Sequence, residues 1–157
     1  MSARSLGARR AFWEFLGRPW VARLLSLGLV LATGTVIAIA MWLDPAAEGH
    51  GTHQQLGLNR CSFLSATGYP CPMCGATTSF TLWAHLNPIR GIVNQPFASL
   101  LFLMTLGTFG VSLVEMFDPR DRWRRLLSLL APYEGRLATG FLAIMGLSWI
   151  YKIWLMA

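Results

Sequence analysis

The sequence predicts an all-α membrane protein with three transmembrane helices and a short helix between the first two. Of its 157 residues, 54% are hydrophobic. Only 13% are charged, about half of the roughly 25% that soluble domains carry. The hydrophobic residues gather in three long blocks, each with about the 20 residues that a helix needs to cross a hydrocarbon core of about 30 Å. The composition therefore favours a chain that crosses a membrane over a soluble helical bundle.

The first block, residues 21–43, holds a single charged residue, Arg23, at its start. Lipid offers no hydrogen-bonding partner to an unpaired backbone amide, so a segment of this composition is expected to be helical. The apolar run is longer than the roughly 7–15 residues of a signal-peptide core, and we interpret it as a retained anchor. Residues 1–20 form a basic arm before it.

The second block covers residues 97–117 and the third covers residues 137–156. Helices buried in a soluble protein normally alternate these apolar faces with a polar stripe, which favours membrane spans here as well. Glu115 lies near the end of the second block, and we expect it at the cytoplasmic interface beside Asp118. Lys152 lies near the end of the third block. We expect its ammonium group to extend to the membrane surface.

The arginines predict the orientation of the chain. Five fall in residues 1–23 and five in residues 118–136, whereas residues 44–96 hold two. Basic residues beside spans stay cytoplasmic, so we predict a cytoplasmic amino terminus, a basic cytoplasmic loop at 118–136 and an extracytoplasmic loop at 44–96. Topology and anionic headgroups account for the net charge of +6. We expect membrane lipids as partners and no nucleic acid; a membrane-protein partner and a homo-oligomer both stay open.

The extracytoplasmic loop contains every residue type suited to metal or redox chemistry. The three histidines and three cysteines of the chain all fall in it, in the order His50, His53, Cys61, Cys71, Cys74 and His85. The stretch CPMCG is followed by hydroxyl residues that suit a helix N-cap and then by apolar residues at helical spacing. We predict a short helix at about 76–86, ended by Asn87 and Pro88. It is too short to span, so we expect it to be interfacial or re-entrant.

A cysteine pair just before a helix suits two kinds of chemistry. The free amides and partial positive charge of a helix start stabilise thiolates, as thiol–disulfide exchange by Cys71 and Cys74 requires. In an oxidising compartment, Cys61 could form a structural disulfide with either of them. A structural zinc site needs four ligands, which the cysteines and one histidine could supply. The candidate ligands are Cys61, Cys71, Cys74, His85, His53 and His50.

Three functional interpretations follow from these residues. The chain has no recognisable nucleotide-binding or hydrolase motif, and we assign it no enzyme activity. The first interpretation is a structural or accessory membrane protein with a cysteine-containing CPxCG loop at the outer membrane face. Zinc binding through the cysteines and a histidine is one alternative. A membrane thiol–disulfide oxidoreductase that uses Cys71 and Cys74 is the other.

The cysteine stretch also resembles a known family. The residues TGYPCPMCGATTSF, with Cys61 before them, are similar to an uncharacterised family of small bacterial integral membrane proteins, a domain of unknown function with a T-G-x-x-C-P-x-C-G-x-T-R motif. The likeness runs from about Cys61 to Leu103, and Thr78 stands in the place of the motif's arginine. The matching residues are Thr67, Gly68, Cys71, Pro72, Cys74, Gly75 and Thr77. The resemblance implies a bacterial cytoplasmic (inner) membrane location and brings no established reaction with it.

Overall fold

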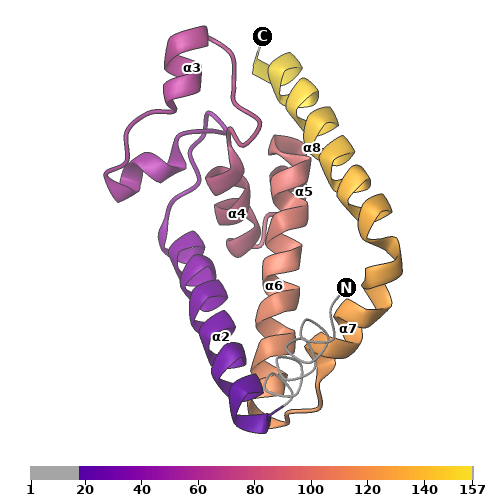
Figure 1. Cartoon of the computed structure of the whole chain (residues 1–157). Coiled ribbons are helices and arrows are strands. Elements are labelled where there is room, and N and C mark those ends of the chain that lie inside the picture. Colours follow the sequence, from indigo (N-terminus) through magenta and orange to yellow (C-terminus); the bar gives the residue numbers. More distant parts are fainter. Residues whose placement is uncertain (1–17, 157) are drawn as a thin grey trace. The chain divides into compact units, whose positions relative to one another are not determined.

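The computed structural model describes residues 18–156, and every regular element within them is helical (Figure 1). Three helical regions are long and apolar enough to cross a membrane. They are α2 (Pro19–Trp42), α6 (Pro96–Phe117) and the region Arg122–Met156, which contains α7 (Arg122–Leu130), the 3₁₀ turn η2 (Ala131–Tyr133) and α8 (Glu134–Met156). The predicted all-α membrane fold is confirmed. Most of the predicted basic arm at 1–20 lies outside the described residues.

Shorter helices fill the segment between α2 and α6. They are η1 (Thr52–Leu56), α3 (Ser62–Thr67), α4 (Ala76–Ala84) and α5 (Pro88–Asn94). The sequence pattern predicts α4, with Asn87 and Pro88 as its end, but it does not predict α5. Pro88 also begins α5, because proline suits the first turn of a helix, where its missing amide hydrogen is not needed.

The long helices expose large apolar side chains over much of their surface. Leu31 in α2, Met104 in α6 and Leu147 in α8 are 62%, 53% and 68% exposed, respectively. In water such surfaces would be costly, at about 25 cal/mol for each Å² left in contact with solvent. Against lipid tails they carry no such cost, which is the reason these helices suit a bilayer.

The described chain forms two compact units. The first consists of residues 18–34 and 107–132, and the second of residues 35–106 and 133–156. The division falls within helices α2 and α6. All the predicted cysteine and histidine candidates belong to the second unit.

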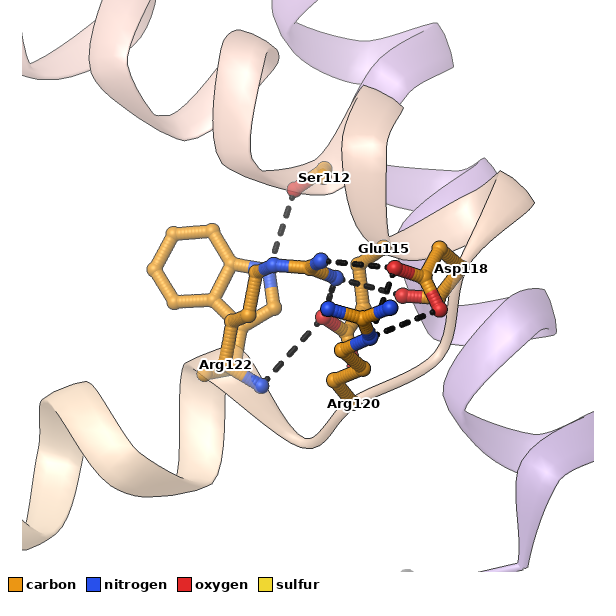
Figure 2. A network of polar contacts seen from close by, with 6 residues as sticks. Ser112, Glu115, Asp118, Arg120 and Arg122 are labelled. Carbon is orange, nitrogen blue, oxygen red and sulfur yellow. Dashed lines mark hydrogen bonds and ion pairs between the residues drawn. The ribbon is translucent and has the colours of Figure 1, made fainter.

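In the first unit, an ion-pair cluster joins the end of α6 to the start of α7 (Figure 2). Glu115 is 2% exposed, and its Oε2 accepts hydrogen bonds from the Arg122 backbone nitrogen at 3.2 Å and from Arg122 Nη1 at 3.1 Å. Asp118 accepts hydrogen bonds from Arg122 Nη2 at 3.0 Å and from Arg120 Nε at 3.1 Å. The guanidinium of Arg122 therefore holds two carboxylates and fixes the first turn of α7. The expected neighbourhood of Glu115 and Asp118 is found, with Arg122 as the shared partner.

In the second unit, aromatic side chains build the core around the start of α6. The rings of Phe97 and Phe141 pack edge to face at 4.8 Å, and those of Phe80 and Phe102 do so at 5.1 Å. The backbone nitrogen of Phe97 donates to Ser148 Oγ at 3.1 Å, which fastens the start of α6 to the second half of α8. A chain that crosses a bilayer three times puts the end of its first span, the start of its second and the end of its third on one side. Residues 35–106 and 133–156, which include these three segments, form a single unit.

Helices α4 and α5 pack closely because a glycine lies between them. A Cβ on Gly91 would be 2.6 Å from Cδ1 of Trp83 and 3.3 Å from the carbonyl oxygen of Ser79. The Ser79 hydroxyl donates to the Gly91 carbonyl at 3.1 Å. Helix α5 therefore packs directly against α4, the short helix after the cysteines. This contact fixes the position of α4 in the second unit.

Candidate functional site, a cysteine-lined cavity

The three cysteines line one cavity of about 810 Å³ in the second unit. Cys61 lies just before α3, whereas Cys71 and Cys74 belong to the turn that leads into α4. His50 and His53 contribute to the same wall. The structure therefore brings together the three cysteines and two of the three predicted histidines, and all three cysteines are free thiols. We call this space the thiol cavity.

The turn that carries Cys71 and Cys74 depends on glycine. The backbone nitrogen of Cys74 donates to the Cys71 carbonyl at 2.9 Å, which closes the turn. Gly75 follows with φ of +85°, a left-handed conformation that a side chain disfavours. A Cβ at this position would lie 2.5 Å from the carbonyl oxygen of Gly49. Both the backbone conformation and the space around Gly75 therefore call for glycine.

Three backbone carbonyls in this turn each accept a hydrogen bond from a distant side chain. Trp149 Nε1 in α8 donates to the Pro70 carbonyl at 2.8 Å. Gln95 Nε2 donates to the Pro72 carbonyl at 2.7 Å, and Asn94 Nδ2 donates to the Gly75 carbonyl at 3.0 Å. A buried carbonyl without a partner is costly, so these bonds select one conformation of the turn. The two thiols of the turn are held in place from outside it.

The other motif residues have local structural roles. Thr67 Oγ1 donates to the Phe63 carbonyl at 2.7 Å and accepts from the Tyr69 backbone nitrogen at 3.2 Å, so it closes the end of α3. Gly68 ends that helix with φ of +76°. Thr77 lines the thiol cavity, and its carbonyl accepts from Thr81 Oγ1 at 2.8 Å. Thr78, at the position of the motif's arginine, is buried in a 2.8 Å hydrogen bond with the Thr52 hydroxyl.

The three thiols differ in how readily they ionise. The pKa of Cys61 is lowered, mainly because its sulfur accepts a hydrogen bond from the Leu64 backbone amide, and also because Cys71 is hydrogen-bonded to it. The pKa of Cys71 is raised, first by burial and then by its hydrogen bond to Cys61. Burial also raises the pKa of Cys74, the charge of Cys61 adds to this, and the charge of Lys152 opposes it. Both other cysteines influence the pKa of Cys71, and we therefore call it the central thiol.

The polar residues that contact the cysteine turn from α8 are not predicted by the sequence pattern. Lys152 is 1% exposed, so the expectation that it reaches the membrane surface is wrong. Its Nζ instead donates to Asn94 Oδ1 at 2.8 Å and to the carbonyls of Gly49 and Asn94 at 3.2 and 3.3 Å. These acceptors satisfy the ammonium group inside the protein. One signal was available: Ser148 and Lys152, four residues apart, mark a polar face near the end of α8.

The two histidines that line the thiol cavity each have a backbone carbonyl as a polar neighbour. His50 Nδ1 lies 3.0 Å from the Glu48 carbonyl, and His53 Nε2 lies 3.1 Å from the Asn59 carbonyl. His85 caps the end of α4 and is not one of the residues that line the thiol cavity. Within residues 18–156, no group of three or more His, Cys, Asp or Glu side chains is arranged to hold a metal ion.

Comparison with known proteins gives a family likeness over part of the chain. A search of the curated proteins gave no match, and neither did a search of the solved structures. The match to a protein-family model begins at Cys61, includes the cysteine turn, α4 and α5, and ends within α6. It agrees with the resemblance to an uncharacterised family. Over residues 61–109, this chain is similar to the family described as "Protein of unknown function (DUF2752)".

Proposed function

We propose that this chain is a small multi-pass protein of the bacterial cytoplasmic membrane, with its amino terminus in the cytoplasm, that performs thiol–disulfide exchange in an extracytoplasmic cavity. One observation carries the proposal: three free thiols line one cavity, and those of Cys61 and Cys74 both influence the pKa of Cys71. A purely structural disulfide needs only one pair of cysteines. Three adjacent thiols beside an open space can instead pass a disulfide from one pair to another.

The differences between the thiols assign the order of attack. Cys61 has the lowered pKa and is the least buried of the three, so it provides the attacking thiolate. It attacks one sulfur of a partner's disulfide, forming a mixed disulfide while the partner's other sulfur leaves as a thiolate. Cys71, once deprotonated, attacks the Cys61 sulfur and releases the second partner thiol. The partner's disulfide is thereby reduced to two thiols, and Cys61 and Cys71 are oxidised to a disulfide.

The anchored turn supports this chemistry. Exchange requires the attacked sulfur to lie in line with the attacking and leaving sulfurs, so the central cysteine must be held in position. The bonds to the carbonyls of Pro70 and Pro72 supply such positioning on either side of Cys71. The reverse reaction uses the same groups, and the reduction potential of the partner decides the direction.

Disulfide mapping of the purified full chain tests the proposal. The chain is equilibrated in glutathione buffers of stepped potential, free thiols are alkylated, and disulfides are identified by mass spectrometry. We expect Cys61–Cys71 and Cys71–Cys74 disulfides, and we expect Cys71→Ser to abolish both. Thiols that stay free at every potential would contradict the proposal. A membrane-impermeant maleimide applied to intact cells tests the orientation, because it should label Cys61.

Zinc binding is the second candidate, favoured by the presence of His50 and His53 on the same wall as the cysteines. Three thiolates and one imidazole make a common tetrahedral zinc set. His85, which is absent from this wall, is the weakest of the three histidine candidates. Zinc analysis of the purified chain and of Cys74→Ser tests this candidate. About one zinc ion per chain, lost in the variant, would support it over exchange.

A further inference from the structure

Lys152 places a positive charge in the interior of the second unit without a carboxylate beside it. Its side chain is 1% exposed. The salt bridges among the described residues all involve Arg120 or Arg122, and none reaches Lys152. The three hydrogen bonds of its ammonium group go to neutral oxygens, those of Gly49 and Asn94. A buried charge is costly unless an opposite charge is available nearby.

Among the residues that the structure describes, the ionisable group that acts on this ammonium group is a cysteine thiol. A Cβ on Gly75, the residue after Cys74, would lie 3.1 Å from Lys152 Nζ. Within residues 18–156, Cys74 is the titratable group that interacts electrostatically with Lys152. The groups that face Cys74 are the thiols of Cys61 and Cys71 and this ammonium group. Of these three, only Lys152 can carry a positive charge.

The ammonium group is also held in a fixed position. Asn94 Oδ1 accepts from Lys152 Nζ at 2.8 Å. The other end of the same amide donates to the Gly75 carbonyl at 3.0 Å and to Ser79 Oγ at 2.9 Å. Both ends of the Asn94 amide are thereby engaged. Asn94 therefore ties the charge of α8 to the backbone of the cysteine turn.

We infer that Lys152 is the counter-charge for the thiolate that Cys74 forms when a Cys71–Cys74 disulfide is opened from the Cys61 side. The Cys61 thiolate attacks the Cys71 sulfur, so the Cys61–Cys71 bond forms and the Cys71–Cys74 bond breaks. The electron pair of the broken bond goes to the Cys74 sulfur, which leaves as a thiolate beside the ammonium group. No proton, reductant or oxidant is consumed in this step. The inference rests on the proposed exchange function and makes Lys152 a positioning residue for it.

The pH dependence of Cys74 alkylation tests this role. The full chain carrying Cys61→Ser and Cys71→Ser keeps Cys74 as its single thiol, and its reaction with iodoacetamide is followed from pH 6 to pH 11 in lipid nanodiscs. Lys152→Gln removes the charge but can still donate hydrogen bonds, whereas Lys152→Arg keeps the charge. We expect Lys152→Gln to slow alkylation at pH 8 by about tenfold, a shift of about one pH unit in the midpoint. We expect Lys152→Arg to stay within about threefold of the parent.

The plateau of the Cys74 alkylation rate at high pH distinguishes an effect of the Lys152 charge from an effect on how the reagent reaches the sulfur. A merely structural role for Lys152 would change the plateau, because it would change how the reagent reaches the sulfur, and would leave the midpoint alone. An unchanged midpoint in Lys152→Gln would overturn the inference. If that variant does not fold, Lys152→Met in the same single-thiol chain provides the neutral comparison, and an unchanged midpoint there has the same meaning.

Disulfide mapping keeps this inference distinct from the proposed function. If Lys152→Gln shifts the Cys74 midpoint but no disulfide forms in the parent chain, the exchange function fails, and Lys152 is only a charge that stabilises Cys74. If disulfides form in the parent and the midpoint does not move, exchange stands and the role of Lys152 is overturned. If the exchange function and the role of Lys152 both hold, Lys152→Gln should also shift the equilibrium from the Cys61–Cys71 disulfide towards the Cys71–Cys74 disulfide. The reason is that the Cys74 thiolate is less stable without the ammonium group.

Discussion

Trp149 and Pro70 lie 79 residues apart in the sequence, yet the indole Nε1 of the first donates a 2.8 Å hydrogen bond to the carbonyl of the second. Pro70 directly precedes Cys71. A side chain in the second half of α8 therefore fixes the position of the backbone just before Cys71. The consequences of this relationship and of its neighbours can be measured.

Replacing Trp149 by Phe should destabilise the turn and leave the helix intact. The substitution removes the bond to Pro70 and keeps an aromatic ring, so we expect a loss of about 0.5–1.5 kcal/mol in the free energy of unfolding. Thermal unfolding followed by circular dichroism in detergent measures it. Trp154→Phe is the matched control, because Trp154 is in the same helix and 75% exposed. Equal losses in the two variants would show that the bond to Pro70 contributes nothing.

Gly75 should tolerate alanine less well than Gly68 does. Both have positive φ, +85° and +76°, so both variants carry a conformational cost of about 1–2 kcal/mol. At Gly75 the new Cβ would also be 2.5 Å from the Gly49 carbonyl, whereas at Gly68 it meets nothing within 4 Å. We therefore expect Gly75→Ala to lower the melting temperature clearly more than Gly68→Ala. Equal shifts would mean that the backbone of Gly49 moves aside at little cost.

Cys61 should react with iodoacetamide at lower pH than the other two thiols. The thiolate is the reactive form, and its fraction grows as the pH rises through the pKa. Since the pKa of Cys61 is lowered, chiefly by the Leu64 amide, and burial raises those of Cys71 and Cys74, the midpoint of Cys61 should come first. Three chains with one cysteine each, the others changed to serine, give the three midpoints. A Cys61 midpoint above that of Cys74 would contradict the assigned order of attack.

The cluster at the start of α7 should depend on Arg122 rather than on its neighbours in the helix. Arg122→Gln leaves Glu115, which is 2% exposed, without its cationic partner, so we expect a lower melting temperature. Arg124→Gln is the control, since Arg124 is exposed and has no ion pair among the described residues. Similar melting temperatures for both variants would show that Glu115 does not need the pair.

The same cluster should weaken in acid. Arg122, hydrogen-bonded to Asp118, lowers the pKa of that carboxyl group, and Arg120 adds to the effect. A carboxylate whose folded-state pKa is lowered stabilises the fold above its unfolded-state pKa, and this contribution is lost as the pH falls through the folded-state value. Asp118→Asn should therefore flatten the dependence of the melting temperature on pH below neutrality. If Asp118→Asn keeps the full pH dependence of the melting temperature, that dependence arises from other groups.

Sequence patterns were sufficient for the spans and insufficient for the site. The apolar blocks predict α2, α6 and α8 because a single segment in lipid can satisfy its own backbone hydrogen bonds only as a helix. The sequence also grouped the cysteines in one loop. It could not show that Gln95 and Trp149 hold the backbone on either side of Cys71, because these bonds join residues 23 and 79 positions apart. Lys152 was misread for the same reason: its acceptors at Gly49 and Asn94 are close only after folding.

The long-range bonds from α8 also have a consequence for biosynthesis. A ribosome makes the cysteine loop before it makes α8, and Lys152 joins the Gly49 carbonyl across 103 positions of sequence. The newly made sulfurs therefore pass through an interval in which neither the indole nor the ammonium group that later surrounds their turn has been synthesised. The bonds from Trp149 and Lys152 can form only after the last helix has been made, so the order of translation determines when the cysteine turn receives its long-range contacts.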